Sequence, residues 1–182
     1  MKTFMMVVLM TCIATAPAMA GGLGVFGSYW DPSDADGDFG LGARLHLFSV
    51  AGVGLELRGS YFEFSESEGG VSQTLEVIPL EAALIYAFGS DQPIQAYAGG
   101  GGGYYMLDLE WSGPLGTMDP DVDDEIGWFV LGGLSFDIAA NLNLFLEAKY
   151  TWLEIDEIGG FATTQDDSLD GFGANAGLML VW

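Results

Sequence analysis

The 182-residue chain has few cations, a single cysteine and no long apolar run after residue 20. It carries four Lys or Arg residues against 26 Asp or Glu residues, one cysteine (Cys12) and one histidine (His46). A surface this acidic repels phosphate groups, which excludes nucleic acid as a partner. The longest apolar runs after residue 20 are shorter than the roughly 18 residues that a transmembrane helix needs, which excludes such a helix there.

Residues 1–20 have the features of a secretory signal peptide. A lysine precedes the apolar stretch FMMVVLMTCIATA, and APAMA follows, with Ala18 and Ala20 as the small residues of a cleavage site. We therefore expect export, cleavage after Ala20 and one mature domain of residues 21–182. A lipoprotein signal ending at Cys12 is the rival, but the polar residue before that cysteine is atypical of such a signal.

The mature domain keeps neither a cysteine nor many cations. Without residues 1–20 no disulfide is available, so stability must come from packing or from a membrane. Three cations remain, Arg44, Arg58 and Lys149, against all 26 acidic residues. Half of the residues are apolar and 28 are glycine, so the composition is not that of a disordered chain.

Apolar and polar residues alternate with a period of two after residue 20, which predicts β-strands. The predicted strands are 23–30, 39–49, 52–64, 74–88, 93–110, 126–138, 141–155 and 170–182. The short connections are 49–52, 89–93 and 138–141, and the long ones are 31–38, 65–73, 111–125 and 156–168. An even strand number with alternating short and long loops predicts an all-β, eight-stranded antiparallel up-and-down transmembrane β-barrel.

The two faces of each predicted strand differ in composition. The face that begins at Leu142 is apolar and ends in aromatic residues, while the opposite face mixes Glu147 and Lys149 with Phe145. A charge on a lipid-facing strand surface costs about 2–4 kcal/mol near the bilayer midplane, and the apolar faces carry none. We therefore predict that the apolar faces point outward; the rival is a secreted soluble barrel with the opposite orientation.

Aromatic residues near the ends of the apolar faces predict a lipid-facing girdle. Its expected members are Tyr29, Tyr61, Tyr86, Phe88, Trp128, Tyr150, Trp152, Phe172 and Trp182.

Five consecutive glycines, Gly99–Gly103, stand between tyrosines in the predicted strand 93–110. The run lacks GxGxxG spacing and no Lys-Ser/Thr follows, so it is not a nucleotide-binding loop. Glycine within a barrel strand permits a sharp bend and leaves room for neighbouring side chains. The run does not fix which face each later residue takes; we expect Asp108 and Glu110 inward and Leu107 and Leu109 outward.

All mature cations fall on the predicted inner face, together with three glutamates. Ionised groups inside a narrow barrel must be paired, because an isolated buried charge is costly. The predicted interior charge cluster is Arg44, Glu56, Arg58, Glu81, Glu147 and Lys149. Two interpretations remain open, a gated ion or proton path and a salt-bridged plug that closes the lumen, and the plug is favoured.

His46 is interpreted as a histidine hydrogen-bonded within the barrel. No Ser-His-acid group forms around it in the sequence pattern, and a lone histidine without cysteine is a poor zinc site. We therefore expect no enzymatic activity and no cofactor.

Four stretches of the sequence resemble the small eight-stranded outer-membrane barrels of the OmpA/OmpX type, the outer membrane protein beta-barrel family. They are VIPLEAALIYAF (77–88), PIQAYAGGGGGYY (93–105), LFLEAKYTW (144–152) and the terminal GLMLVW. The resemblance implies a monomer in the outer membrane of a Gram-negative-type bacterium, with a structural or surface-interaction role. A narrow porin-like conduit for small apolar or cationic solutes is the alternative. The last strand is similar to the signal that such proteins present to the barrel assembly machinery, although Trp182 replaces the usual Phe.

The expected partners are outer-membrane lipid and lipopolysaccharide, with divalent cations as bridges to an acidic rim. Asp34, Asp36 and Asp38 are weak metal candidates, because alignment to an EF-hand places Pro32 at the first ligand position. A rim that is only solvated is the simpler interpretation.

Overall fold

The computed structural model describes residues 21–33, 37–68, 71–89, 93–113, 116–118, 124–153, 157–158, 161–162 and 169–182. The long strands are β1 (Gly22–Pro32), β2 (Asp38–Val50), β3 (Val53–Glu68), β4 (Val71–Phe88), β5 (Ile94–Gly113), β7 (Glu125–Ala139), β8 (Leu142–Trp152) and β11 (Gly171–Val181). The short strands are β6 (Gly116–Met118), β9 (Glu157–Ile158) and β10 (Phe161–Ala162). The described part of the chain has no helix long and apolar enough to cross a membrane.

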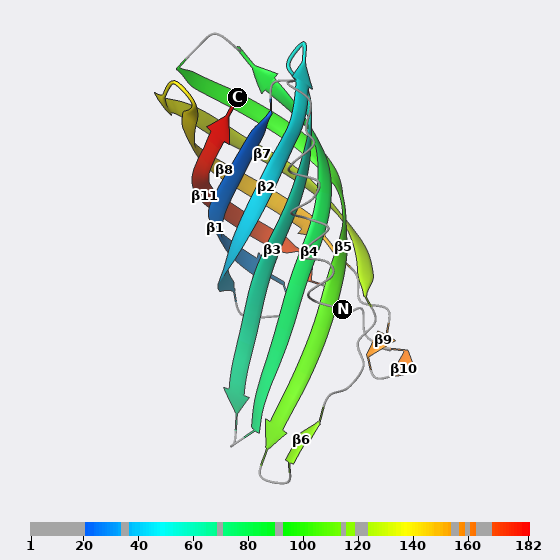
Figure 1. Cartoon of the computed structure of the whole chain (residues 1–182). Coiled ribbons are helices and arrows are strands. Elements are labelled where there is room, and N and C mark those ends of the chain that lie inside the picture. The colour runs from blue at the N-terminus through cyan, green and yellow to red at the C-terminus, as the bar shows by residue number, and fades with distance from the viewer. Residues whose placement is uncertain are drawn as a thin grey trace.

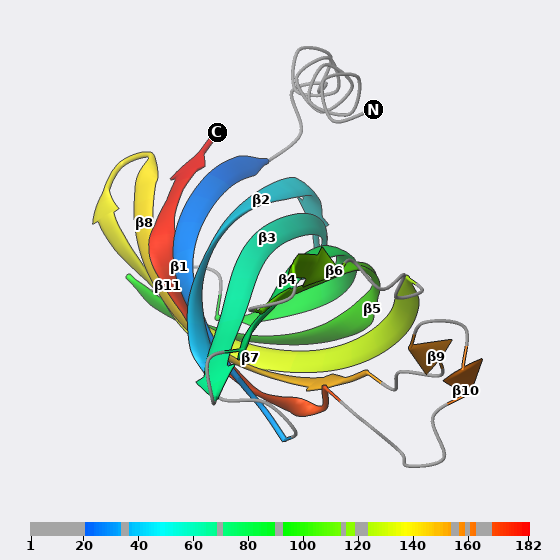
Figure 2. The same ribbon diagram turned by 90° about the horizontal axis from the view of Figure 1, so that it is seen from below.

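The eight long strands form a closed antiparallel barrel, as predicted. Their order is β4-β3-β2-β1-β11-β8-β7-β5, and the additional pairing of β4 with β5 closes the ring. The first and last strands pair from Gly22↔Val181 to Pro32↔Gly171. Figure 2 shows the strands encircling a common axis. Gly21 and Trp182 hydrogen bond each other through their backbones, so the two ends of the described chain lie at the same end of the barrel.

Three strands extend well beyond the rest at the end of the barrel that carries the long connections (Figure 1). The pairing of β2 with β3 stops at Leu41↔Tyr61, whereas the pairing of β3 with β4 continues to Glu68↔Val71. The prediction of a loop over 65–73 is therefore wrong for most of its length. Its serines, glutamates and glutamine lack an apolar face, but neighbouring strands still supply backbone hydrogen bonds to this segment.

Side chains alternate between the interior and the outer surface along the long strands where their burial is described. The pattern is clearest in β11, where buried and exposed residues alternate from Gly171 to Ala176. The large side chains left exposed are predominantly the apolar ones of the predicted outer faces, among them Leu84, Leu134 and Leu146. The barrel therefore has an apolar exterior and a mixed interior.

Strand β5 keeps one phase through its glycine run. Its pairing with both neighbours is continuous across Gly99–Gly103, without a bulge. Tyr105 and Leu107 are buried inside, whereas Asp108 is exposed on the outer face. The expectation for Leu107 and Asp108 is therefore wrong, because Leu107 packs into an interior apolar cluster and Asp108 lies on the part of the sheet that projects beyond the barrel. The side chains of Leu109 and Glu110 lie outside the described part.

The glycines of β5 allow a close approach to β4. A Cβ atom added at Gly101 would overlap the carbonyl oxygen of Ala82, and one added at Gly99 would overlap the carbonyl oxygen of Leu84. A side chain at either position would push the two strands apart. The glycine run therefore shapes the wall of the barrel.

Candidate functional site in the barrel interior

The structure brings all six residues of the predicted charge cluster into the lumen. Arg44 comes from β2, Glu56 and Arg58 from β3, Glu81 from β4, and Glu147 and Lys149 from β8. Five of the six residues are at most 5% exposed, and the Lys149 side chain is 10% exposed. Their side chains point inward because successive side chains of a strand point to opposite faces, and the apolar neighbours of each residue occupy the outer face.

Arg58 is the most extensively paired residue of the cluster. Its Nη1 and Nη2 atoms donate to Glu147 Oε1 and Oε2, both at 2.7 Å. Its Nε atom donates to Glu56 Oε1 at 2.8 Å. The planar guanidinium therefore binds Glu147 in a two-pronged geometry, the strongest arrangement available to this pair.

This ion pair spans the barrel. Arg58 is on β3 and Glu147 on β8, and three strands separate β3 from β8 in either direction around the ring. The two side chains therefore meet from opposite walls of the lumen, and the lumen is occluded at that level.

Polar neighbours complete the environment of Glu147. Tyr97 donates its hydroxyl to Glu147 Oε2 at 3.1 Å, and Asn175 Nδ2 donates to Oε1 at 2.8 Å. Ser28 in turn hydrogen bonds Asn175 Oδ1. A buried carboxylate is tolerated when its oxygens are hydrogen bonded in this way.

A second charge pair lies beside the first. Lys149 Nζ is 2.6 Å from Glu81 Oε1, and the hydroxyl of Tyr105 donates to the same oxygen at 2.7 Å. Tyr105 also belongs to a buried apolar cluster with Trp30 and Phe62, toward the end with the long connections. An aromatic layer therefore covers the charge pairs on that side.

Arg44 is held differently from Arg58. Its guanidinium carbon lies 3.4 Å from the ring centroid of Phe145, a cation–π contact. Its Nη1 atom is 3.7 Å from Glu56 Oε1 and 3.6 Å from Glu147 Oε2, and its Nε has no partner in the described part of the chain. Arg44 therefore balances the charge of Glu56 and Glu147, but its Nη1 atom is too far from their oxygens for a hydrogen bond.

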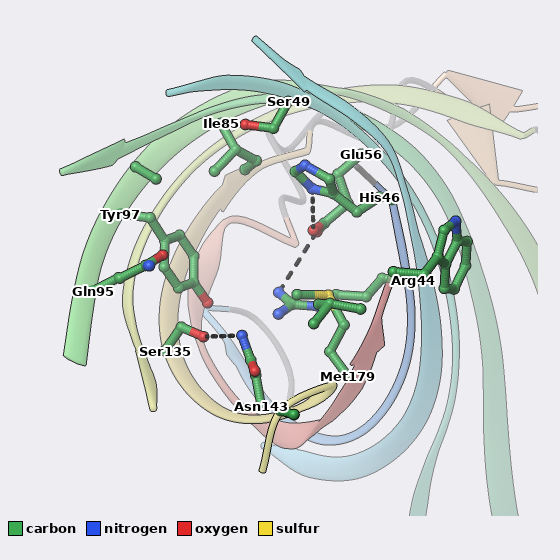
Figure 3. Close-up of a pocket in the computed structure, with 15 residues that line it drawn as sticks. Arg44, His46, Ser49, Glu56, Ile85, Gln95, Tyr97, Ser135, Asn143 and Met179 are labelled. Atoms are coloured by element: carbon green, nitrogen blue, oxygen red, sulfur yellow. Dashed lines mark hydrogen bonds and ion pairs between the residues drawn. The ribbon is translucent and has the colours of Figure 1, made fainter. Parts of the chain in front are cut away.

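A cavity of about 410 Å³ opens at the end of the barrel with the short turns. Gly21 and Trp182 are among its lining residues. Arg44, Glu56 and Tyr97 also line it (Figure 3). Below we call it the turn-end cavity. The lumen is therefore hollow on one side of the charge pairs and packed with aromatic rings on the other.

His46 lines the turn-end cavity. Its Nδ1 atom is 3.8 Å from Glu56 Oε2, an ion-pair distance that exceeds a normal hydrogen bond. Ser49 lines the same cavity, but among the described residues no hydrogen bond joins His46 to a serine. The geometry of a nucleophile activated by a histidine is therefore missing from the described part.

The nine aromatic residues of the predicted girdle lie on the outer face. Some of these rings touch: Tyr150 and Phe172, on neighbouring strands, have centroids 4.8 Å apart, and Tyr86 and Phe88, both on β4, have centroids 4.9 Å apart. Trp182 is 55% exposed and also borders the turn-end cavity.

The metal candidates have no common site in the described structure. Asp34 and Asp36 lie outside the described residues, and Asp38 accepts a hydrogen bond from the backbone N–H of Phe39 at 2.6 Å. No group of three or more His, Cys, Asp or Glu side chains within the described ranges is arranged to hold a metal ion.

Several residues of the site are absent from the prediction. Tyr97, Tyr105 and Asn175 hydrogen bond the charge cluster, and all three share the inward phase of their strands. The alternation of inward and outward residues along each strand was enough to predict that these side chains are buried. It does not reveal which carboxylate each one contacts, because that depends on which strands face each other across the lumen.

A closed eight-stranded barrel with an apolar exterior, aromatic girdle and ion-paired interior defines a class of membrane proteins whose strands cross the bilayer. The chain belongs to the outer membrane protein beta-barrel domain family, whose model matches residues 7–179. This family is found in the bacterial outer membrane, and its small barrels are in general not enzymes. The turn end with the two described chain ends corresponds to the periplasmic end of such barrels.

Solved structures share this fold at low sequence identity. OprG from Pseudomonas aeruginosa is 15% identical, with 90% of this chain and 97% of that chain covered and a TM-score of 0.62. OmpW from E. coli is 15% identical, with 91% and 100% covered and a TM-score of 0.59. Ail, the attachment invasion locus protein of Yersinia pestis, is 12% identical, with 90% and 97% covered and a TM-score of 0.52; it is also known in complex with the heparin analogue sucrose octasulfate. No curated protein is significantly similar to the chain.

Proposed function

We propose that this protein is a non-enzymatic, monomeric outer-membrane barrel with a structural or surface-interaction role and a lumen that does not conduct. The observation that carries the proposal is the ion pair of Arg58 with Glu147 from opposite walls, at 2.7 Å for both contacts. The aromatic layer around Trp30 and Tyr105 supports it, because it fills the lumen on the other side of the charge pairs.

Conductance across a planar bilayer tests this proposal. We expect no single-channel steps from the wild-type barrel, and none from the outward control Leu146→Met. The double variant Glu147→Met/Lys149→Met breaks both charge pairs, because Glu147 pairs with Arg58 and Lys149 pairs with Glu81. Conductance of this variant alone would show that the charge pairs close the lumen. Steady conductance of the wild type would favour the alternative, a narrow conduit for small apolar or cationic solutes.

The charge distribution bears on which surface partners fit. Arg44, Arg58 and Lys149 are the only cations after residue 20, and all three face the lumen. A sulfated polyanion, such as the heparin analogue bound by Ail, therefore meets no cation on this exterior. We expect the refolded protein to flow through a heparin column at about 0.15 M salt, and retention there would contradict this part of the proposal.

The proposal has three further parts. The protein is exported by a cleaved signal peptide (residues 1–20), the barrel assembly machinery inserts it by way of the last strand, and divalent cations link it to lipopolysaccharide.

The contact through divalent cations can be tested with calcium. Because acidic side chains of the rim and lipopolysaccharide phosphates repel each other, calcium is expected to raise the melting temperature of the barrel in lipopolysaccharide-containing bilayers. The same titration in phosphatidylcholine alone is the control, and equal responses in both would remove the bridging role.

A further inference from the structure

The turn-end cavity contains a buried cation with an unused donor. The Arg44 side chain is 3% exposed, and its Nε–H has no acceptor in the described part of the chain. Its Nη1 atom stays 3.6–3.7 Å from the nearest carboxylate oxygens. By contrast, Arg58 uses Nε, Nη1 and Nη2 at 2.7–2.8 Å. A buried charged donor without an acceptor is costly, so the geometry favours an acceptor that enters the cavity.

Phe145 limits how that acceptor approaches. Its ring covers one face of the guanidinium at 3.4 Å, so an acceptor has to approach along an edge of the guanidinium. Two parallel N–H groups on one edge match the two oxygens of a carboxylate. Figure 3 shows the Arg44 guanidinium extending from the wall of the barrel toward the middle of the lumen.

Most of the remaining cavity surface is apolar. Ile85, Ala87, Met179 and Val181 line it, together with the polar side chains of Gln95, Ser135 and Asn143. Its volume of about 410 Å³ lies within the range typical of small-ligand pockets. We propose that the turn-end cavity binds a small monocarboxylate with an apolar body, entering from the periplasmic side, with Arg44 as the residue that anchors the carboxylate.

The charges around Arg44 determine how the bound anion is balanced. Arg58 hydrogen bonds both Glu56 and Glu147. The group of Arg44, Arg58, Glu56 and Glu147 therefore has no net charge before the ligand binds. A bound carboxylate adds one negative charge to this group, next to the Arg44 guanidinium.

This site goes beyond the proposed structural role and does not require passage through the lumen. A barrel that binds the ligand and still fails to conduct satisfies both proposals, whereas conductance contradicts only the closed lumen.

Titration of the mature protein in lipid nanodiscs with sodium benzoate tests the site. The readout is the NMR signal of the Met179 methyl group, and benzyl alcohol serves as a probe of similar shape without the charge. We expect a saturable shift with benzoate and at least about tenfold weaker binding of benzyl alcohol, a difference of about 1.4 kcal/mol. Equal affinities for the two probes, or no benzoate shift at all, would overturn the proposal.

Three variants separate the site from general effects on the fold. Arg44→Gln is expected to weaken benzoate binding at least tenfold, and Ala87→Phe, which fills the cavity, is expected to abolish it. Ala82→Phe places the same ring on the outer face of the same strand and should leave binding unchanged. Benzoate binding that survives both Arg44→Gln and Ala87→Phe in barrels that still shift on unboiled gels refutes the site.

Discussion

Removal of the Arg58 guanidinium should be the most damaging single change in the barrel interior. Arg58→Met takes away three hydrogen bonds of 2.7–2.8 Å and leaves Glu56 and Glu147 as buried carboxylates. Breaking a buried pair by removing one partner costs about 3–5 kcal/mol. Arg44, 3.6 Å from Glu147, can move closer to take over part of the charge, so we expect a loss within that range and not above it.

The double variant Arg58→Met/Glu147→Met distinguishes charge from packing. It leaves Arg44 and Glu56 as a balanced pair, and replacing both partners of a buried ion pair with apolar groups is often nearly neutral. We therefore expect the double variant to be more stable than Arg58→Met alone. Leu57→Met, on the outer face of the same strand, is the matched control and should change stability by less than about 1 kcal/mol.

Urea unfolding of the protein in phosphatidylcholine vesicles, followed by tryptophan fluorescence, measures these differences. A heat-modifiable band on gels verifies that each variant is folded before the titration. The reasoning is refuted if Arg58→Met unfolds like the wild type, or if the double variant loses at least as much stability as the sum of its single variants.

Three further predictions use the same assay. Gly101→Ala should lose about 1–3 kcal/mol because its Cβ overlaps the Ala82 carbonyl, whereas Gly27→Ala, which meets nothing within 4 Å, should be nearly neutral; equal effects would contradict the close approach. Tyr105→Phe should lose about 1–3 kcal/mol with the hydrogen bond to a charged acceptor, and an unchanged midpoint would argue against that bond. Glu76→Gln should gain about 0.2–1 kcal/mol, because position 76 faces acidic residues on both neighbouring strands, and the gain should shrink at high salt; a loss would contradict repulsion there.

The period of two in the sequence was sufficient to predict the barrel and the orientation of its faces. In β8, Leu146 and Glu147 take opposite sides as the alternation requires, and the rare ions therefore fall inside. The same rule failed at two places. The polar segment 65–73 lacks the apolar face that signals a strand, and the glycine run carries no side chains from which to read the phase of Leu107 and Asp108.

The pairing inside the lumen was beyond the reach of sequence patterns. Alternation places Arg58 and Glu147 inward, but it does not state that β3 and β8 stand opposite each other. That relation follows from the closure of the ring and the register of all eight strands. The turn-end cavity and the unused donor of Arg44 depend on the same register, together with the position of the Phe145 ring.

Spin labels at single cysteines test most directly whether apolar side chains meet lipid while polar ones line the interior. The only cysteine of the chain is Cys12, so labels can be placed in residues 21–182 without competition. We predict that labels at positions 84 and 146 relax with oxygen dissolved in the bilayer, whereas a label at position 143 relaxes with a water-soluble nickel complex. Nickel access at positions 84 and 146, with oxygen access confined to position 143, would contradict the account.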